Sequence, residues 1–161
     1  MIKQAELKQL ELVKFITLKT IIDIYPHYYP KGAVDFFIEH HNESHISKDI
    51  ESYQNSINEL LIDRDEDAKR IAAVGTVTIH KNEICRLFVL PQYQKRGFGN
   101  QILKFAEDMI LKDYKTVVLD ASLPAKSIYL KRGYIIVETH SIQTYHNDYL
   151  CYDVMIKEID K

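Results

Sequence analysis

The segment PQYQKRGFGNQ, residues 91–101, contains residue types that could bind an anion. Gly97 and Gly99 stand beside the adjacent cations Lys95 and Arg96, between an apolar run and an amphipathic run. A glycine-rich turn that leads from a strand into a helix leaves backbone N–H groups pointing outward, and glycine lets a phosphate approach without a Cβ in the way. The segment therefore predicts a phosphate site, and the alternative is a tight turn that only starts a helix.

Two common phosphate motifs do not fit this segment. A dinucleotide fingerprint needs a third glycine three residues after Gly99, where Ile102 stands. A Walker loop needs Gly-Lys followed by serine or threonine, and the sequence contains no such tripeptide. The remaining pattern is Gln94-x-x-Gly97-x-Gly99.

Hydrophobic patterning on both sides of this segment predicts an α+β chain around one sheet, in a single domain of residues 1–161. Runs rich in β-branched and aliphatic residues with short turns between them predict an antiparallel meander, and apolar residues after Gly99 follow helical spacing. The expected strands are 56–63, 70–80, 83–90, 115–122, 134–142 and 149–157. A short helix is expected within 124–134, with Pro124 near its start and Gly133 as the glycine that follows its end.

The N-terminal region predicts helices, with one ambiguity. A short strand near Leu12–Phe15 followed by a helix from Thr17 is the first interpretation, and one continuous helix fits the pattern almost as well. A second helix is expected from Pro30 to near Asn42, and a third short helix after Ser44.

Composition and charge exclude several classes of protein. The formal net charge of −2 argues against a general nucleic-acid binder. The N-terminal residues lack the apolar core of a signal peptide, and no apolar run is long enough to span a bilayer. Cys85 and Cys151 are too few and too far apart for a disulfide framework, so both are expected to be buried thiols. We expect a cytoplasmic protein that binds neither nucleic acid nor membrane.

A metal site is not expected. His41 and His45 stand four residues apart, but the glutamate of the zinc-peptidase helix is one place late. The acidic run at 63–67 imitates a calcium loop, yet Ala68 replaces the required glycine.

The segment RLFVLPQYQKRGFG, residues 86–99, resembles the Gcn5-related N-acetyltransferase family, in which an apolar strand is followed by Gln/Arg-x-x-Gly-x-Gly/Ala and a helix. A second family motif, Asn-x-x-Ala-x-x-x-Tyr-x-x-x-Gly-Phe/Tyr, is matched by Ser122, Ala125, Tyr129, Gly133 and Tyr134. Ser122 departs from the family asparagine, because serine is shorter and has one donor. The resemblance covers roughly Ile71 to the C-terminus, and more loosely the N-terminal helices.

The resemblance implies a mixed, mostly antiparallel central sheet flanked by helices on both faces. It implies an enzyme that moves an acetyl group from acetyl-CoA to a primary amine of a small molecule or peptide by direct attack, without a metal. A non-catalytic acyl-CoA-binding or regulatory domain is the alternative. The contacts it implies with acetyl-CoA are Phe88, Val89, Leu90, Gln94, Lys95, Arg96, Gly97, Phe98, Gly99, Asn100, Ser122, Ser127 and Tyr129.

Acyl transfer to an amine first requires that the amine lose a proton. For a lysine-like pKa of about 10.4, reaching the free amine at pH 7 costs roughly 4–5 kcal/mol. A carboxylate working through water can accept that proton. Glu83 is the candidate base, since its separation from Gln94 matches the catalytic glutamate of histone-type family members. The alternative is that Glu83 is a solvated residue after a turn.

The tetrahedral oxyanion and the departing thiolate need donors as well. The resemblance points to the backbone N–H of Val89 or Leu90 for the oxyanion. It points to Tyr129 as the general acid for the thiolate, and a core tyrosine is the alternative reading of that residue.

The resemblance places the acceptor pocket between the N-terminal helices and the loop between the last two strands. Aromatic and acidic side chains in these regions would suit a cationic amine. They are Tyr25, Tyr28, Tyr29, Asp35, Phe36, Phe37, Glu39, Glu43, Tyr145, His146, Asp148 and Tyr149. The identity of the amine stays open, and so does a homodimer, which the family often forms through edge strands.

Overall fold

The computed structural model describes residues 1–42, 46, 57–65 and 70–158 and contains a seven-stranded sheet. The spatial order is β1-β2-β3-β4-β5-β7-β6, and every neighbouring pair is antiparallel except β4 and β5, which run parallel. The strands are β1 Ile2–Gln4, β2 Ile57–Asp65, β3 Arg70–His80, β4 Glu83–Val89, β5 Thr116–Ala121, β6 Ile135–Gln143 and β7 Tyr149–Glu158. The expected meander and the later strands are confirmed.

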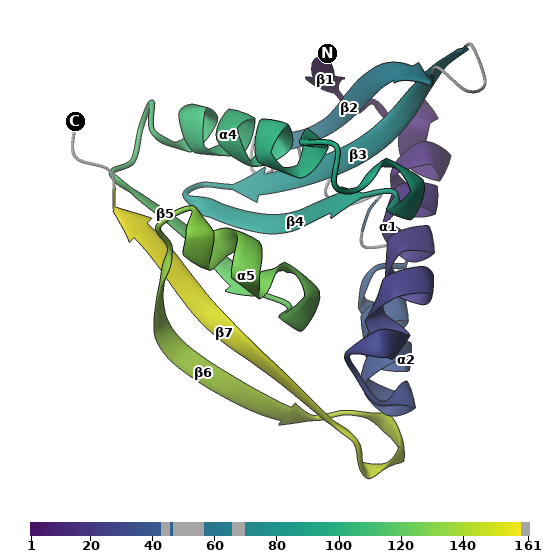
Figure 1. Cartoon of the computed structure of the whole chain (residues 1–161), viewed down its shortest axis with the longest axis vertical. Coiled ribbons are helices and arrows are strands. Elements are labelled where there is room, and N and C mark those ends of the chain that lie inside the picture. Colours follow the sequence, from purple (N-terminus) through teal and green to yellow (C-terminus); the bar gives the residue numbers. More distant parts are fainter. Residues whose placement is uncertain (43–45, 47–56, 66–69, 159–161) are drawn as a thin grey trace.

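Helices cover both faces of the sheet (Figure 1), as expected. In that view α4 and α5 lie in front of the strands. Helix α1 packs on β3 and β4 from the other face of the sheet, and α2 lies next to α1. The α-helices are α1 Leu10–Ile24, α2 Lys31–His40, α4 Phe98–Ile110 and α5 Leu123–Lys131. The short 3-10 helices are η1 Leu7–Gln9, η2 Tyr25–His27, η3 Pro91–Tyr93 and η4 Tyr145–Asn147. Among the residues that the structure describes, no helix has the length and apolarity to cross a membrane.

The predicted strand at Leu12–Phe15 is wrong, because α1 is one continuous helix over this region. Its buried residues recur at helical spacing, so one face of the helix packs on the sheet. Leu12 and Phe15 lie on the exposed face, at 45% and 53% exposure. Because apolar residues stand on both faces of the helix, the helical spacing of the buried ones could not be recognised in the sequence. The buried residues are Val13, Ile16, Thr17, Thr20 and Ile21.

The expected helix from Pro30 is confirmed as α2, with Pro30 as its N-cap. The short helix expected after Ser44 and most of the turn expected at 64–69 lie outside the described residues. At the other end of the chain, Gly133 follows α5 with φ +92°, the left-handed conformation that favours glycine after a helix. That helix end is therefore as the sequence predicts.

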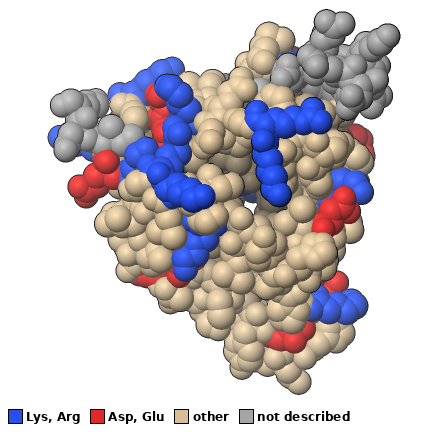
Figure 2. Space-filling model, in the orientation of Figure 1, with Lys and Arg blue, Asp and Glu red and all other residues tan. Residues whose placement is uncertain are grey.

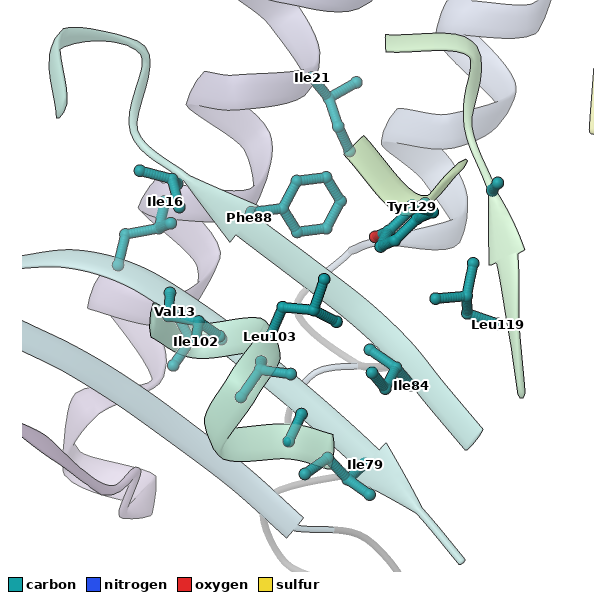
Figure 3. Close-up of a cluster of buried hydrophobic side chains, with 14 of the residues drawn as sticks. Val13, Ile16, Ile21, Ile79, Ile84, Phe88, Ile102, Leu103, Leu119 and Tyr129 are labelled. Carbon is teal, nitrogen blue, oxygen red and sulfur yellow. The ribbon is translucent and has the colours of Figure 1, made fainter. Parts of the chain in front are cut away.

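A buried apolar cluster joins the helices to the middle of the sheet (Figure 3). Ile102 and Leu103 of α4 belong to the same cluster as Ile79 of β3 and Ile84 of β4, and all four are buried. Leu119 of β5 lies at the edge of the same cluster. The cluster therefore fixes α4 over the three central strands.

The pairing between β4 and β5 is very short. Thr78 of β3 is in register with Arg86, and Ile79 with Ile84, which leaves Cys85 as the extra residue of a β-bulge. A bulge bends its strand and strengthens the local twist. Strands β4 and β5 pair only at the register positions of Glu83 and Ile84 and then diverge, as Figure 1 shows. We call the region between residues 85–89 of β4 and the end of β5 the β4–β5 split.

Candidate active site

The end of β4 directs backbone donors into the β4–β5 split. The N–H of Leu90 donates to the carbonyl of Val74 at 2.9 Å, so Leu90 belongs to a hydrogen-bonded pair with β3. Hydrogen-bonded and non-hydrogen-bonded pairs alternate along an antiparallel ladder. The N–H groups of Val89 and Leu87 therefore point away from β3, toward the split. Of the two expected oxyanion donors, Leu90 is occupied by the sheet and Val89 has the required direction.

The carbonyl of Val89 accepts a hydrogen bond from Gln94 and has a second, longer contact with Thr20. The Nε2 of Gln94 donates to it at 2.9 Å, and the Oγ1 of the buried Thr20 in α1 approaches it at 3.3 Å. The Thr20 hydroxyl also donates to the carbonyl of Ile16 at 2.7 Å. Gln94, expected at the phosphate site, thus holds the turn to the end of β4. Thr20 was missed because a threonine inside a helical pattern carries no signal of a contact with a distant strand.

The two glycines at the start of α4 have different roles. Gly97 is the N-cap of α4 and has a φ of +90°, a left-handed conformation that favours glycine, so the chain needs a glycine here. Lys95, two residues earlier, also has a positive φ, of +61°. Gly99 lies inside α4, outside the left-handed region. An ideal Cβ built on Gly99 meets nothing within 4 Å. The fold therefore does not require a glycine at position 99, and its missing side chain leaves open space beside the first turn of α4.

The first turn of α4 has the electrostatic character of an anion site. The first N–H groups of a helix have no partner within it, and here the N-cap residue has no side chain and the first turn has no acidic residue. Lys95 and Arg96 are exposed next to this turn, and the Arg96 guanidinium lies 5.6 Å from the centroid of the Tyr93 ring. In Figure 2, lysine and arginine side chains gather on the half of this face that carries α4, and a hollow opens beside them.

Two further predicted contacts flank the same turn. Phe98 is half-buried with its ring 6.4 Å from that of Tyr93, so it anchors the start of α4. Asn100 is exposed on the first turn, beside Gly99. The structure thus brings together the predicted turn residues from Lys95 to Asn100.

Glu83 lies at the closed end of the split and has a carboxylate neighbour. Leu119 belongs to the cluster on the α4 side, so Asp120, the next residue of β5, points to the opposite face. Glu83 is in register with Val118, two residues before Asp120, and therefore shares that opposite face. Burial and then the charge of Asp120 raise the pKa of Glu83, while His80 lowers it. The sequence did not indicate Asp120, because the parallel register of β4 and β5 cannot be read from it.

Both cysteines are exposed, so the expectation of buried thiols was wrong. Cys85 is displaced by the bulge in β4 and loses the alternation on which that expectation rested. Desolvation by its neighbours and then the charge of Glu83 raise the pKa of the Cys85 thiol to about 11. A thiol that stays protonated at neutral pH is a poor nucleophile.

Tyr129 of α5 is buried on the opposite face of the sheet from Glu83. Figure 3 places its ring between Phe88 of β4 and Leu119 of β5, and its ring also lies 5.6 Å from that of Tyr134. Burial and then the neighbouring Tyr25 raise the pKa of Tyr129. The phenol therefore stays protonated over the physiological pH range and has a proton to donate.

The other predicted contacts occupy different places around the split. The Phe88 side chain is buried among aromatic residues, 5.7 Å from the His41 ring and 6.5 Å from the Tyr25 ring between centroids. Ser122 is the N-cap of α5; burial raises the pKa of the Tyr25 phenol, and the nearby Ser122 side chain lowers it. Ser127 is exposed on α5. The structure thus directs the Phe88 side chain toward the N-terminal helices.

The two regions expected to form the acceptor pocket do meet. The N–H of Gly32 in α2 donates to the Oδ2 of Asp148 at 2.7 Å, and a Cβ on Gly32 would lie 1.9 Å from the carbonyl oxygen of Tyr145. His146 lies 3.8 Å from Asp35, which also pairs with a lysine. Asp148 and Asp35 are therefore engaged within the protein. Glu43 lies outside the described residues.

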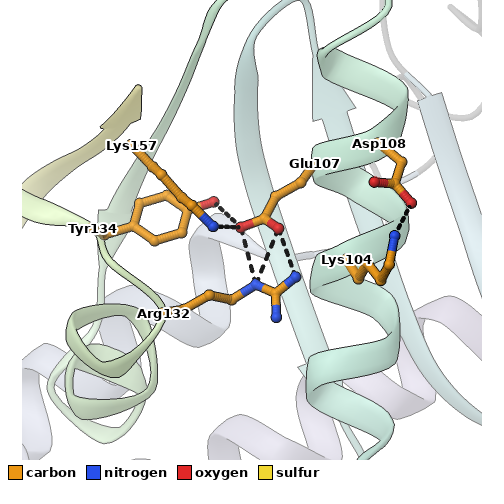
Figure 4. Close-up of polar contacts among 6 residues, drawn as sticks. All are labelled: Lys104, Glu107, Asp108, Arg132, Tyr134 and Lys157. Atoms are coloured by element: carbon orange, nitrogen blue, oxygen red, sulfur yellow. Dashed lines mark hydrogen bonds and ion pairs between the residues drawn. The ribbon is translucent and has the colours of Figure 1, made fainter. Parts of the chain in front are cut away.

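A closed polar cluster ties α4 to the end of α5 (Figure 4). Glu107 of α4, only 4% exposed, accepts hydrogen bonds from Arg132 at 2.6–3.0 Å, from Tyr134 at 3.1 Å and from Lys157 at 3.2 Å. Burial raises the pKa of Glu107, but the hydrogen bonds and charges of Arg132 and Lys157 outweigh it and lower the pKa. We call these four residues the Glu107 cluster.

Over the described ranges, no group of three or more histidine, cysteine, aspartate or glutamate side chains could hold a metal ion.

Comparison with protein families gives a match over most of the chain. The family model described as "Acetyltransferase (GNAT) domain" matches residues 24–149. No curated protein sequence matches the chain.

Solved structures of low sequence identity share the fold. A GCN5-related N-acetyltransferase from Rhodopseudomonas palustris is 15% identical with a TM-score of 0.84, over 99% of this chain and 95% of that one. PaiA N-acetyltransferase from Thermoplasma acidophilum, in complex with coenzyme A, is 18% identical with a TM-score of 0.75, over 99% and 98% of the two chains. The ribosomal-protein-S18-alanine N-acetyltransferase from Escherichia coli is 15% identical with a TM-score of 0.70, over 100% and 94%.

Proposed function

Since this chain belongs to the GNAT acetyltransferase family, we propose that it moves an acetyl group from acetyl-CoA to a primary amine by direct attack. The observation that carries the proposal is Gly99, where the fold needs no glycine and the space beside the first turn of α4 is open. A Cβ at this position would enter the space through which a phosphate would reach the helix N–H groups. Lys95 and Arg96 supply positive charge at the same place.

The β4–β5 split suits the extended chain that joins the pyrophosphate of acetyl-CoA to its thioester. The N–H groups of Leu87 and Val89 face the side of β4 that β5 has left. An amide-containing chain can pair with such donors as an added strand would. The thioester, which supplies an activated acetyl group, would then lie beside β4. Its developing oxyanion would be within reach of one of these two N–H groups.

The candidate base and the candidate acid approach this position from opposite faces of the sheet. Glu83, on the face of the N-terminal helices, accepts the proton of the attacking ammonium through water. Its raised pKa makes it a better proton acceptor than an ordinary carboxylate. Tyr129, on the α5 face, donates to the sulfur as the C–S bond breaks. Because a thiol of pKa about 8.5 leaves readily as a thiolate, this help is the smaller contribution.

We further propose that the acceptor binds on the face of Glu83, between the N-terminal helices and the β6–β7 loop. Asp120 adds a second negative charge on this face, beside Glu83. Aromatic side chains also stand where α2 meets the β6–β7 loop, among them Phe36 and Tyr145, whose ring centroids are 6.3 Å apart. Carboxylates with aromatic rings favour a cationic amine of a small molecule or a peptide.

The direct test is a panel of small-molecule and peptide amines with acetyl-CoA, in which thiol release and acetylated product are both measured. We expect turnover on at least one cationic amine, and a Glu83→Gln variant should lose most of it at neutral pH. Retained CoA binding without turnover on any amine would contradict the enzyme and support a non-catalytic acyl-CoA-binding domain.

A further inference from the structure

The N-terminus of α5 is capped by a residue that is distant in the sequence. The N-cap residue Ser122 makes no side-chain capping hydrogen bond, and Pro124 has no N–H to be satisfied. The N–H of Leu123, the first residue of the helix, donates instead to the Oη of Tyr29 at 2.7 Å. Tyr29 therefore does for α5 what an N-cap side chain ordinarily does.

A second tyrosine from the same segment reinforces this contact. Burial raises the pKa of the Tyr25 phenol and the nearby Ser122 side chain lowers it, and the rings of Tyr25 and Tyr29 lie 5.6 Å apart between centroids. Both tyrosines are only 6% exposed. Burial raises the pKa of Tyr29 to about 12, so its hydroxyl stays neutral at any working pH. Two neutral phenols thus link the end of α1 and η2 to the start of α5.

The position of α5 depends on such polar contacts more than on burial. Tyr129 is its only buried residue, while Leu123, Ile128 and Leu130 are 41–47% exposed. A helix that buries little apolar surface gains little from the hydrophobic effect. Other polar anchors of α5 in the described part of the chain are the Lys126–Asp153 ion pair and the contact of the adjoining Arg132 with Glu107.

The tyrosine contact is also the anchor beside the candidate acid. Tyr25 contributes to the raised pKa of Tyr129, so the two phenols are electrostatic neighbours. Arg132 and the Glu107 cluster hold the other end of the helix. Small rotations of α5 about that end would move the Tyr129 hydroxyl relative to β4.

We propose that Tyr29 is a positioning residue, which holds the N-terminus of α5 so that the Tyr129 hydroxyl meets the departing sulfur. This inference rests on the proposed acetyltransferase function. It also couples the two sides of the active site, because Tyr29 belongs to the segment that borders the acceptor region. Tyr29 acts through Tyr129 and makes no contact with the reacting atoms.

The test combines a Tyr29→Phe variant with a Tyr129→Phe background. If the acid contributes about a hundredfold, the low end of the usual range, we expect Tyr29→Phe to lower kcat by about tenfold while the KM for acetyl-CoA changes less than twofold. In the Tyr129→Phe background the same change should lower kcat by less than about twofold. Tyr114→Phe, which alters an exposed tyrosine between α4 and β5, is the matched control and should leave kcat unchanged.

Two outcomes overturn the positioning role while the proposed function stands. One is an equal loss of kcat in both backgrounds, and the other is a folded Tyr29→Phe variant with normal kcat. Absence of turnover by the unmodified protein on every amine would instead contradict the proposed function. Amide hydrogen exchange over residues 123–131 needs no turnover, and Tyr29→Phe should accelerate it at Leu123 by about tenfold. Unchanged exchange there would refute the capping contact itself.

Discussion

The β4–β5 split and the Glu107 cluster are two polar regions of the same sheet and its helices, and their polar groups are paired to different degrees. In the Glu107 cluster a buried carboxylate accepts hydrogen bonds from three side chains, so the cluster is closed. At the split, the bulge at Cys85 turns β4 away from β5, and N–H groups point where no strand of the described chain continues. Polar groups that are hydrogen-bonded within the protein stabilise the fold, whereas N–H groups that point away from the sheet are available to a ligand. The predictions below test this difference.

The largest expected effect is on stability and belongs to the closed region. Glu107→Ala leaves Arg132 and Lys157 close together without their acceptor, so we expect the free energy of unfolding to fall by about 3 kcal/mol. Urea denaturation measures it. Asp108→Ala is the matched control, because Asp108 pairs with Lys104 on the surface of the same helix and should cost no more than about 0.5 kcal/mol (Figure 4).

Equal losses in these two variants would show that the Glu107 cluster is not special. The pH dependence gives a second check. Because the folded pKa of Glu107 is lowered, its contribution is present above the unfolded pKa and is lost as pH falls through the folded pKa. Glu107→Gln should therefore lose less stability on acidification than the unmodified protein.

The second effect separates chemistry from packing at Tyr129. Tyr129→Phe keeps the ring and its contact with Tyr134, and we expect kcat to fall by about a hundredfold while the melting temperature and acetyl-CoA affinity stay nearly unchanged. Steady-state kinetics and thermal unfolding measure the two quantities. A variant that melts early but turns over normally would make Tyr129 a core residue only.

The third effect concerns the open space at the α4 turn. Gly99→Val places a branched side chain where a phosphate would approach, and we expect the Kd for CoA to rise at least about tenfold with little loss of stability. Calorimetry measures the Kd. Gly133→Ala should have the opposite pattern, with a loss of stability and an unchanged Kd for CoA. The loss should be about 1 kcal/mol, because alanine is strained at the φ of +92° that Gly133 adopts. A folded Gly99→Val variant with normal affinity would remove the phosphate site.

The smallest effect is a shift in a pH profile. The charge of Asp120 helps to raise the pKa of Glu83, so Asp120→Asn should lower that pKa. Since the base must be ionised, the acidic limb of kcat/KM should move to lower pH. Glu158→Gln, at the exposed end of β7, should leave the limb in place. An acidic limb unmoved by Asp120→Asn would mean that Glu83 is not the group that titrates.

The sequence predicts local structure well where one signal dominates. The meander, α4 and the glycine after α5 follow from alternation, helical spacing and left-handed conformations, which are properties of neighbouring residues. The start of α1 was misread because Leu12 and Phe15 place apolar side chains on its exposed face. Local patterning cannot distinguish an exposed apolar residue from a buried one.

The site could be predicted only in part, for a related reason. The residues of the α4 turn are contiguous, so their spacing reveals them. Which of Val89 and Leu90 offers its N–H depends on hydrogen-bond alternation relative to β3, and Asp120 depends on the parallel register with β4. Tyr29 reaches α5 from 94 residues away. Such pairings are set by tertiary structure and leave no spacing in the sequence.

The central claim is that the split and the α4 turn bind the same ligand while the Glu107 cluster stays closed. Titration of isotope-labelled protein with CoA, followed by amide NMR shifts, tests it residue by residue. The account predicts the largest shifts at Leu87, Val89, Gly97 and Gly99, with Arg132 and Lys157 nearly unmoved. Saturable binding whose shifts avoid the α4 turn, or titration without any shift at all, would contradict it.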